Sequence, residues 1–389
     1  MPDKTLLDSL ARKVNSEAFR WVGVRCKWLS LVGSCAASAL LVSFIAPQDE
    51  ALAGPRVEVE IPVEIQSDWT FDSDDADAEL NDLFTKTEPF VAIYFTDQLS
   101  LQSQLVIEPL ADPKPGDSRA FESHGIFAEI LLLSYATDRF DIYGGKFNPN
   151  FAVGFDLSPG IYGEDFPEEY EVTERIGVGF STTFGDSDSG IFTFRASTFF
   201  ADTSALSGSL LESRGRLNES DGGPSNTEDL SSFVVSLDGE GVAALGGTSF
   251  HLAVRHQSAG SGDVGDEFGV VGALFTDVAV SNTLTWTPFV ELAYIEDADG
   301  LPEDRFYWTI ASSFLTGPWR ADLAYSQRDT DFQSAVLSTT HGRAVQATIG
   351  YQVAENVLIA AGYKYGREDG LDSHTIGARL SFSYGRVFE

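Results

Sequence analysis

Basic side chains recur at the polar positions of segments in which polar and apolar residues alternate. Arg195, for example, stands between Phe194 and Ala196. Successive side chains of a strand point to opposite faces, so these basic groups are expected on the polar faces of strands. Basic groups gathered in a dry interior would repel one another, so these polar faces are expected to contact water. Their electric field would then attract or orient ions and dipolar solutes. The set comprises Arg175, Arg195, Arg255, Arg320, Arg328, Lys364 and Arg379.

Acidic side chains gather between two of these segments, in residues 148–169. They are Asp156, Glu164, Asp165, Glu168 and Glu169. Each basic residue could instead pair with a carboxylate on its own face, such as Asp322 or Glu291, and only stabilise the strands. The sequence leaves both interpretations open.

The sequence contains no recognisable catalytic or metal-binding motif. Among the five histidines only His251 and His256 are close, and a spacing of five places them on opposite faces of a strand. Gly-x-Ser-x-Gly and phosphate-binding loops are missing. Asp297–Asp304 resembles half of a calcium loop without its final glutamate. We therefore expect no cofactor, no metal and no enzymatic activity, although distant Ser, His and acidic residues could still assemble in a hydrolase.

The net charge limits the possible partners. The 389 residues hold 59 Asp+Glu and only 25 Lys+Arg, a formal charge of −34. Contact with phosphate groups needs a basic face, so nucleic acid is excluded as a partner. After residue 53 the lysines are Lys86, Lys114, Lys146 and Lys364, which is few for a phosphate-selective site.

The first 53 residues are predicted to be a signal peptide that is removed. Basic residues precede an apolar run at 29–46, and Ala51-Leu52-Ala53 matches a small-x-small cleavage pattern. A single membrane anchor, or a lipoprotein acylated at Cys35, remain alternatives. Both cysteines, Cys26 and Cys35, lie in this segment, so the exported chain has no disulfides and needs another source of stability, such as sheet closure.

Residues 54–389 are predicted to form one all-β domain. No later segment has 18 continuous apolar residues, so any membrane crossing must use strands. A soluble β-sandwich also has alternating strands, but several segments here alternate for nine or more residues. The sixteen predicted strands are 57–65, 89–95, 99–108, 122–136, 139–147, 170–184, 190–201, 230–238, 248–257, 267–277, 282–295, 304–315, 318–328, 343–353, 356–366 and 373–388.

Short turns and long acidic loops alternate along the chain. This layout is typical of a transmembrane antiparallel β-barrel, with short periplasmic turns and longer extracellular loops. An even strand number places both termini on the periplasmic side, and about 16 strands (14–18) leave an aqueous channel. Pro62 weakens the prediction of strand 57–65. The acidic run Asp68–Asp82 is predicted to be an exposed loop.

The stretch Phe140-Asp-Ile-Tyr-Gly-Gly-Lys-Phe-Asn-Pro149, followed by Gly154, resembles the strand-to-loop passage of Gram-negative outer-membrane porins. The last strand resembles the assembly signal of that class, with Phe382, Tyr384 and Phe388 on its apolar side, although Glu389 follows the final aromatic residue. The resemblance implies that loop 148–169 folds into the barrel as a constriction, its acidic residues facing the basic wall. It also implies a homotrimer, and contacts with outer-membrane lipid, lipopolysaccharide and the barrel-assembly machinery.

We therefore expect an outer-membrane porin for passive diffusion of ions and small hydrophilic solutes. Two alternatives remain open. One is a substrate-specific channel or receptor, for example for siderophore uptake. The other is an outer-membrane barrel hydrolase.

Overall fold

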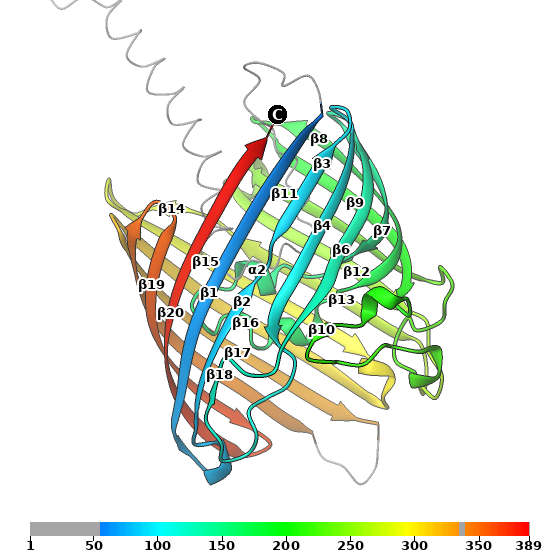
Figure 1. The fold of residues 1–389 in the computed structure, drawn as a ribbon. Helices are drawn as coiled ribbons and strands as arrows, with labels where there is room; N and C mark the ends of the chain where they lie inside the picture. The colour runs from blue at the N-terminus through cyan, green and yellow to red at the C-terminus, as the bar shows by residue number, and fades with distance from the viewer. Residues whose placement is uncertain (1–54, 334–338, 389) are drawn as a thin grey trace, which may run out of the picture.

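The chain forms a closed antiparallel β-barrel of sixteen wall strands (Figure 1). A computed structural model describes residues 55–333 and 339–388, and the predicted signal peptide lies outside them. One wall strand is interrupted, as β2 and β3. The strands are β1 Arg56–Ser73, β2 Asn81–Thr87, β3 Phe90–Tyr94, β4 Leu99–Pro109, β6 His124–Ala136, β7 Phe140–Phe147, β8 Arg175–Asp186, β9 Gly190–Ala201, β11 Ser232–Val242, β12 Thr248–Gln257, β13 Glu267–Phe275, β15 Leu284–Glu296, β16 Glu303–Thr316, β17 Trp319–Phe332, β18 Thr340–Ala354, β19 Val357–Glu368 and β20 Leu371–Phe388.

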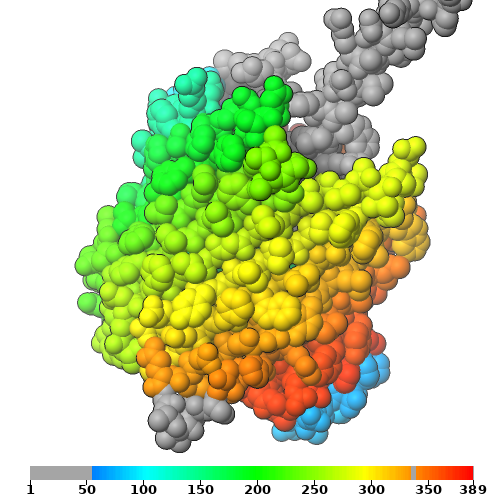
Figure 2. All heavy atoms as spheres, turned by 180° about the vertical axis from the view of Figure 1, so that it is seen from behind, coloured from blue at the N-terminus to red at the C-terminus, as the bar shows by residue number. Residues whose placement is uncertain are grey.

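The first and last strands close the barrel. β1 pairs with β20 in antiparallel register from Val57↔Phe388 to Ser73↔Ser373, with one irregularity near Thr70. In Figure 1 these strands lie side by side in blue and red. Seen from behind, neighbouring strands follow one another in chain order across the surface (Figure 2). Closure pairs the edge strands, which an open sheet would leave exposed.

The two faces of the wall differ in chemistry, as the alternation predicted. Large apolar side chains such as Ile142, Leu252 and Ile349 are exposed on the outside. Ser134, Ser236 and Gln346 are buried on the inside. An apolar outer band around a polar interior is the arrangement of a barrel whose solvent outside is lipid.

The connections at the two ends of the barrel differ in length. At the end that holds both described termini, turns such as 137–139 and 355–356 are short, although 276–283 includes β14 Val278–Ala279 and 243–247 includes η5 Ala243–Leu245. The longest connections lie at the other end. They contain β5 Arg119–Ala120, β10 Leu210–Leu211, α2 Gly154–Leu157 and the 3-10 helices η1 Ala76–Ala78, η2 Pro167–Tyr170, η3 Ala205–Ser207, η4 Glu219–Asp221 and η6 Ala298–Gly300. No helix in the described ranges is long and apolar enough to cross a membrane.

Several predicted boundaries were wrong. The acidic run Asp68–Asp82 is not one exposed loop, because β1 continues to Ser73 and β2 begins at Asn81. Asp68 accepts hydrogen bonds from Gln66 and Tyr162, and Asp82 pairs with Arg119, so both carboxylates have polar partners. β1 also includes Pro62, which lies opposite Ser383. The strand predicted from residue 170 begins only at Arg175, and β17 to β20 extend further toward the long-loop end than predicted.

Candidate functional site

The connection between β7 and β8, residues 148–174, is called loop 3 below, and it packs against the inner face of the barrel. Phe151, Phe166 and Tyr170 are almost fully buried there. They belong to one apolar cluster with Phe199 of β9 and Tyr307 of β16. Burial of several aromatic side chains supplies the largest favourable term for seating such a loop.

Glu291 of β15 holds the first half of loop 3. Its Oε2 accepts the backbone N–H of Val153 at 3.0 Å, and its Oε1 accepts the hydroxyl of Tyr170 at 2.7 Å. Glu291 is fully buried. A Cβ at Gly154 would collide with its carboxylate, so glycine permits this close approach.

The middle of loop 3 is held by β18, three wall strands beyond β15. Gln346 accepts the N–H of Tyr162 at 3.2 Å and donates to the carbonyl of Pro159 at 2.8 Å. Thr348 accepts the N–H of Ile161 at 3.2 Å. Gly160 has a φ of +97°, and a Cβ there would lie 2.5 Å from Oε1 of Gln346. Loop 3 therefore leaves the wall after β7 and is anchored on the inner face of β15 and β18.

The predicted acidic residues of loop 3 take different partners. Asp165 accepts a hydrogen bond from Lys364 at 2.6 Å. Glu169 accepts from Arg328 at 2.6 Å and from the hydroxyl of Tyr307 at 3.0 Å. Glu164 lies 3.9 Å from Nζ of Lys86. Asp156 lies in α2.

The side chain of Glu168 is exposed, but other residues of the barrel, including Glu164 and Glu108, surround it. The surrounding protein displaces bulk water, and this desolvation raises the pKa of Glu168 to about 7. Lys86 opposes the rise, whereas the negative charges of Glu164 and Glu108 add to it. Glu168 therefore changes its charge near neutral pH.

The predicted basic wall is engaged in contacts along its whole length. Four members hold loop 3: Arg255 donates to the carbonyl of Tyr170 at 2.6 Å, Arg379 donates to the carbonyl of Gly160 at 3.1 Å, and Arg328 and Lys364 bind loop carboxylates as above. The other three are held by the wall or by the end of the loop: Arg195 pairs with Asp238, Arg320 pairs with Asp322, and Arg175 donates to the carbonyl of Thr173 at 2.7 Å. Arg255 and Arg379 also pair with Glu267 and Glu64 of the wall.

The sequence had left open a pairing of Arg320 with Asp322, and the two are 2.7 Å apart. Glu291, the other carboxylate considered, binds loop 3 instead of an arginine. Sequence reasoning therefore identified some of the charged residues of the interior but could not assign their partners.

Sequence reasoning missed Lys86, Glu88 and Glu108, which lie beside the predicted residues Glu164 and Glu168 of loop 3. Lys86 of β2 lies 3.4 Å from Glu88, 4.0 Å from Glu108 and 3.9 Å from Glu164. We call Lys86, Glu88, Glu108, Glu164 and Glu168 the acidic cluster. Asp82, Phe84 and Lys86 share one strand parity, but their assignment to a loop concealed this signal.

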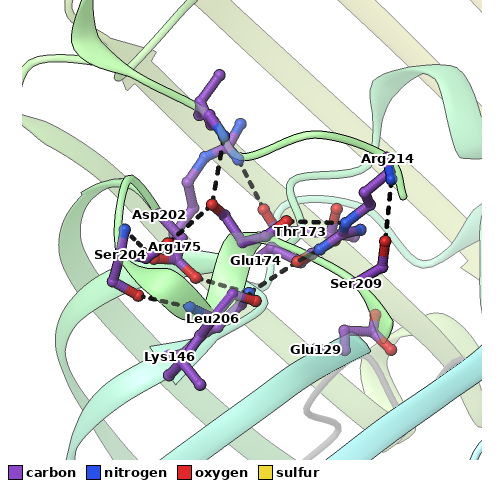
Figure 3. A network of polar contacts seen from close by, with 12 residues as sticks. Glu129, Lys146, Thr173, Glu174, Arg175, Asp202, Ser204, Leu206, Ser209 and Arg214 are labelled. Carbon is purple, nitrogen blue, oxygen red and sulfur yellow. Dashed lines mark hydrogen bonds and ion pairs between the residues drawn. The ribbon is translucent and has the colours of Figure 1, made fainter. Parts of the chain in front are cut away.

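A second network, also missed, fixes the end of loop 3 (Figure 3). Buried Lys146 contacts Glu174 and Asp202, each at 2.7 Å, and Arg214 binds the carboxylate of Glu174 through both terminal nitrogens. Asp202 and Arg214 belong to the connection 202–231, called loop 4 below. β10 of loop 4 also pairs with β6 at Gly125–Ile126, where β7 has already left the wall. Loop 4 thus covers the gap opened by loop 3.

The predicted assembly residues of β20 lie on its outer face. Phe382, Tyr384 and Phe388 are 38%, 48% and 44% exposed. They are paired across the closing seam with Val63, Ile61 and Val57. Glu389 lies outside the described residues.

Comparisons with known proteins find similarity at the level of structure. No family model and no curated protein sequence matches the chain. The outer membrane channel DcaP of Acinetobacter baumannii is 14% identical, with 86% of this chain and 99% of that one covered and a TM-score of 0.56. OprB of Pseudomonas putida is 8% identical (85% and 94% covered, TM-score 0.57). The trimer form of OmpT, an outer membrane protein of Vibrio cholerae, is 13% identical (85% and 100% covered, TM-score 0.52).

At these identities the comparisons establish the fold and leave the solute undefined. The wall strands, the closing β1–β20 seam and the polar interior agree with them. The chain therefore has the sixteen-stranded β-barrel fold of Gram-negative outer-membrane porins.

Proposed function

We propose that the protein is an outer-membrane porin through which ions and small hydrophilic solutes diffuse passively. The observation that carries the proposal is loop 3, which is anchored on the polar inner face of the barrel and contributes Glu164 and Glu168 to the acidic cluster. A barrel of this strand number is wide enough for water, and charged groups at a narrowing set which ions pass. The porin fold supports the same conclusion.

Loop 3 is proposed as the constriction, and its acidic residues as the groups that set ion preference. Since most wall cations are paired, the excess negative charge near Glu164 and Glu168 dominates the local field. The protein is therefore expected to prefer cations. Reversal potentials in a salt gradient measure this preference, and an anion-selective or unselective channel would contradict it.

A substrate-specific channel is the second candidate, and one observation favours it. Loop 3 contacts the wall from β12 to β20 through polar anchors and buried aromatic residues, so it is held firmly inside the barrel. A specific channel would show a small conductance that saturates with its solute, whereas a general porin would show a large conductance proportional to salt concentration. Planar-bilayer recordings distinguish the two.

The hydrolase alternative has less support from the histidines. His251 lies between the carboxylate of Asp238 at 2.7 Å and the carbonyl of Phe151 at 2.8 Å, so both ring nitrogens have acceptor partners. His256 and His341 lie near Asp266 and Asp329, His374 near Tyr363, and His124 near Thr85. These contacts support roles in the wall and its rim.

The last part of the proposal concerns the export of the protein, its contacts in the outer membrane and its oligomeric state. We propose export through the predicted signal peptide, contact of the outer face with outer-membrane lipid and lipopolysaccharide, and recognition of β20 by the barrel-assembly machinery. A homotrimer is proposed because OmpT of Vibrio cholerae has a trimer form. The mass of the detergent-solubilised protein tests the trimer.

A further inference from the structure

Charge is unevenly compensated inside the barrel. The wall cations Arg195, Arg255, Arg320 and Arg379 each have a carboxylate partner within 3.0 Å. The acidic cluster contains four carboxylates and one cation, Lys86, while Arg214 and Arg379 act on Glu108 and Glu164 from outside the cluster. This part of the interior therefore carries a local excess of negative charge.

Lys86 is held less closely than other lysines of the barrel. Its Nζ lies 3.4 to 4.0 Å from three carboxylates, whereas Lys146 and Lys364 contact theirs at 2.7 and 2.6 Å. Charge-assisted N–H···O bonds are normally about 2.7–2.9 Å long. The ammonium also lies 5.0 Å from the ring centroid of Phe155 in loop 3. Lys86 thus sits centrally without a short bond to any one carboxylate.

Glu88 offers an acceptor that the protein itself does not use. Its side chain is 4% exposed, and its Oε2 has no hydrogen-bond partner among the described residues. Leaving such an acceptor unsatisfied costs about 1–3 kcal/mol, so buried groups of this kind normally have partners. Glu88 lines a small hollow with Pro62, Glu64 and Lys86, which has room for about one water molecule.

We propose that the acidic cluster is a binding subsite for the primary ammonium group of a solute, and that Lys86 occupies it as a tethered competitor. An ammonium group presents several N–H donors, and the unsatisfied Oε2 of Glu88 can accept one of them. No group of three His, Cys, Asp or Glu side chains within residues 55–333 and 339–388 is arranged to hold a metal ion. The ammonium of Lys86 shows which chemistry the cluster accepts.

The inference rests on the proposed channel function and adds a ligand class to it. The test records potassium current through the purified full-length protein in planar bilayers while n-butylammonium is added. Butylammonium is expected to reduce the current, and n-butanol and tetramethylammonium, which lack N–H donors, are expected to act far more weakly. Lys86→Met removes the competitor and should lower the inhibition constant about tenfold, whereas Glu88→Gln should raise it about tenfold.

Matched variants control for charge alone. Lys114→Met and Glu122→Gln alter exposed residues of the loop between β4 and β6, and both should leave the inhibition constant unchanged. If Glu88→Gln does not assemble, Glu108→Gln tests the same cluster. Equal inhibition by butylammonium and tetramethylammonium, or an inhibition constant unmoved by both Lys86→Met and the glutamate variant, would overturn the subsite.

A calorimetric titration separates this inference from the channel itself. Butylammonium binding to the detergent-solubilised protein, strengthened in Lys86→Met, would support the subsite even if no current were seen. A clear potassium current with no butylammonium binding would reject the subsite and leave the channel function intact.

Discussion

Glu168 is the charged residue of loop 3 whose ionisation is expected to change within the physiological pH range. Its raised pKa of about 7 means that the carboxyl is neutral below that pH and negative above it. Cation preference should therefore rise as the pH increases from 6 to 8. Reversal potentials measured across this range check the direction, and a preference that falls with increasing pH would contradict the assignment.

Glu168→Gln removes the same charge permanently. Cation preference at pH 8 should fall roughly twofold, because one of several charges near the narrowing is lost, and its change between pH 6 and 8 should largely disappear. Glu122→Gln, at an exposed position, is the matched control. An unchanged pH profile in Glu168→Gln would show that another group titrates.

Glu291 decides how firmly the first half of loop 3 is attached. Glu291→Ala leaves the N–H of Val153 and the hydroxyl of Tyr170 without their acceptor. The free energy of unfolding should fall by roughly 2–4 kcal/mol, since each unsatisfied buried group costs about 1–3 kcal/mol. Urea unfolding followed by tryptophan fluorescence measures this loss. Glu296→Ala, exposed on the same strand, should cost little, and equal losses would refute the anchor.

At the scale of elements, the path of loop 3 depends on glycine where the loop meets β18. Gly160→Ala combines a φ of +97° with crowding against Gln346, whereas Gly262→Ala has a similar φ of +92° and no atom within 4 Å. The first variant should lose more stability than the second by about 1 kcal/mol or more, and its conductance should rise as the loop loosens. Equal effects would mean that the loop does not press on the wall there.

The closing strand β20 supports a separate prediction about assembly. Phe388→Ala should reduce the fraction of folded protein in the outer membrane severalfold, because it removes the last outward aromatic residue of the seam with β1. Val387→Ala, on the neighbouring position, is the control. Equal amounts of folded protein for the two variants, quantified from isolated membranes, would contradict a specific role of Phe388 in assembly.

The sequence predicted the strands well and the interior only in part. Alternation over β16 to β20 was clear because each face meets a different solvent. β2 was missed because Asp82 and Lys86 resemble a polar loop. Their partners Arg119, Glu108 and Glu164 are distant in the chain. The partners of Lys146 were missed for the same reason, since Asp202 and Glu174 come from separate loops.

At the scale of the whole molecule, closure of the sheet is a source of stability for the described residues, which contain no cysteine. Every wall strand has a neighbour on each side, so the barrel should resist dodecyl sulfate at room temperature. The unheated protein is expected to migrate differently from the boiled protein on a gel, and a slow band at three times the mass would indicate the trimer. Identical migration before and after heating would contradict a closed barrel.

The measurement that tests the central claim most directly is single-channel recording of the purified protein, alone and with loop 3 loosened by Gly160→Ala. A water-filled barrel narrowed by loop 3 predicts steady, step-like currents that favour cations, with larger steps in the variant. A protein that inserts into the bilayer and carries no current, or a variant with unchanged step size and ion preference, would contradict it.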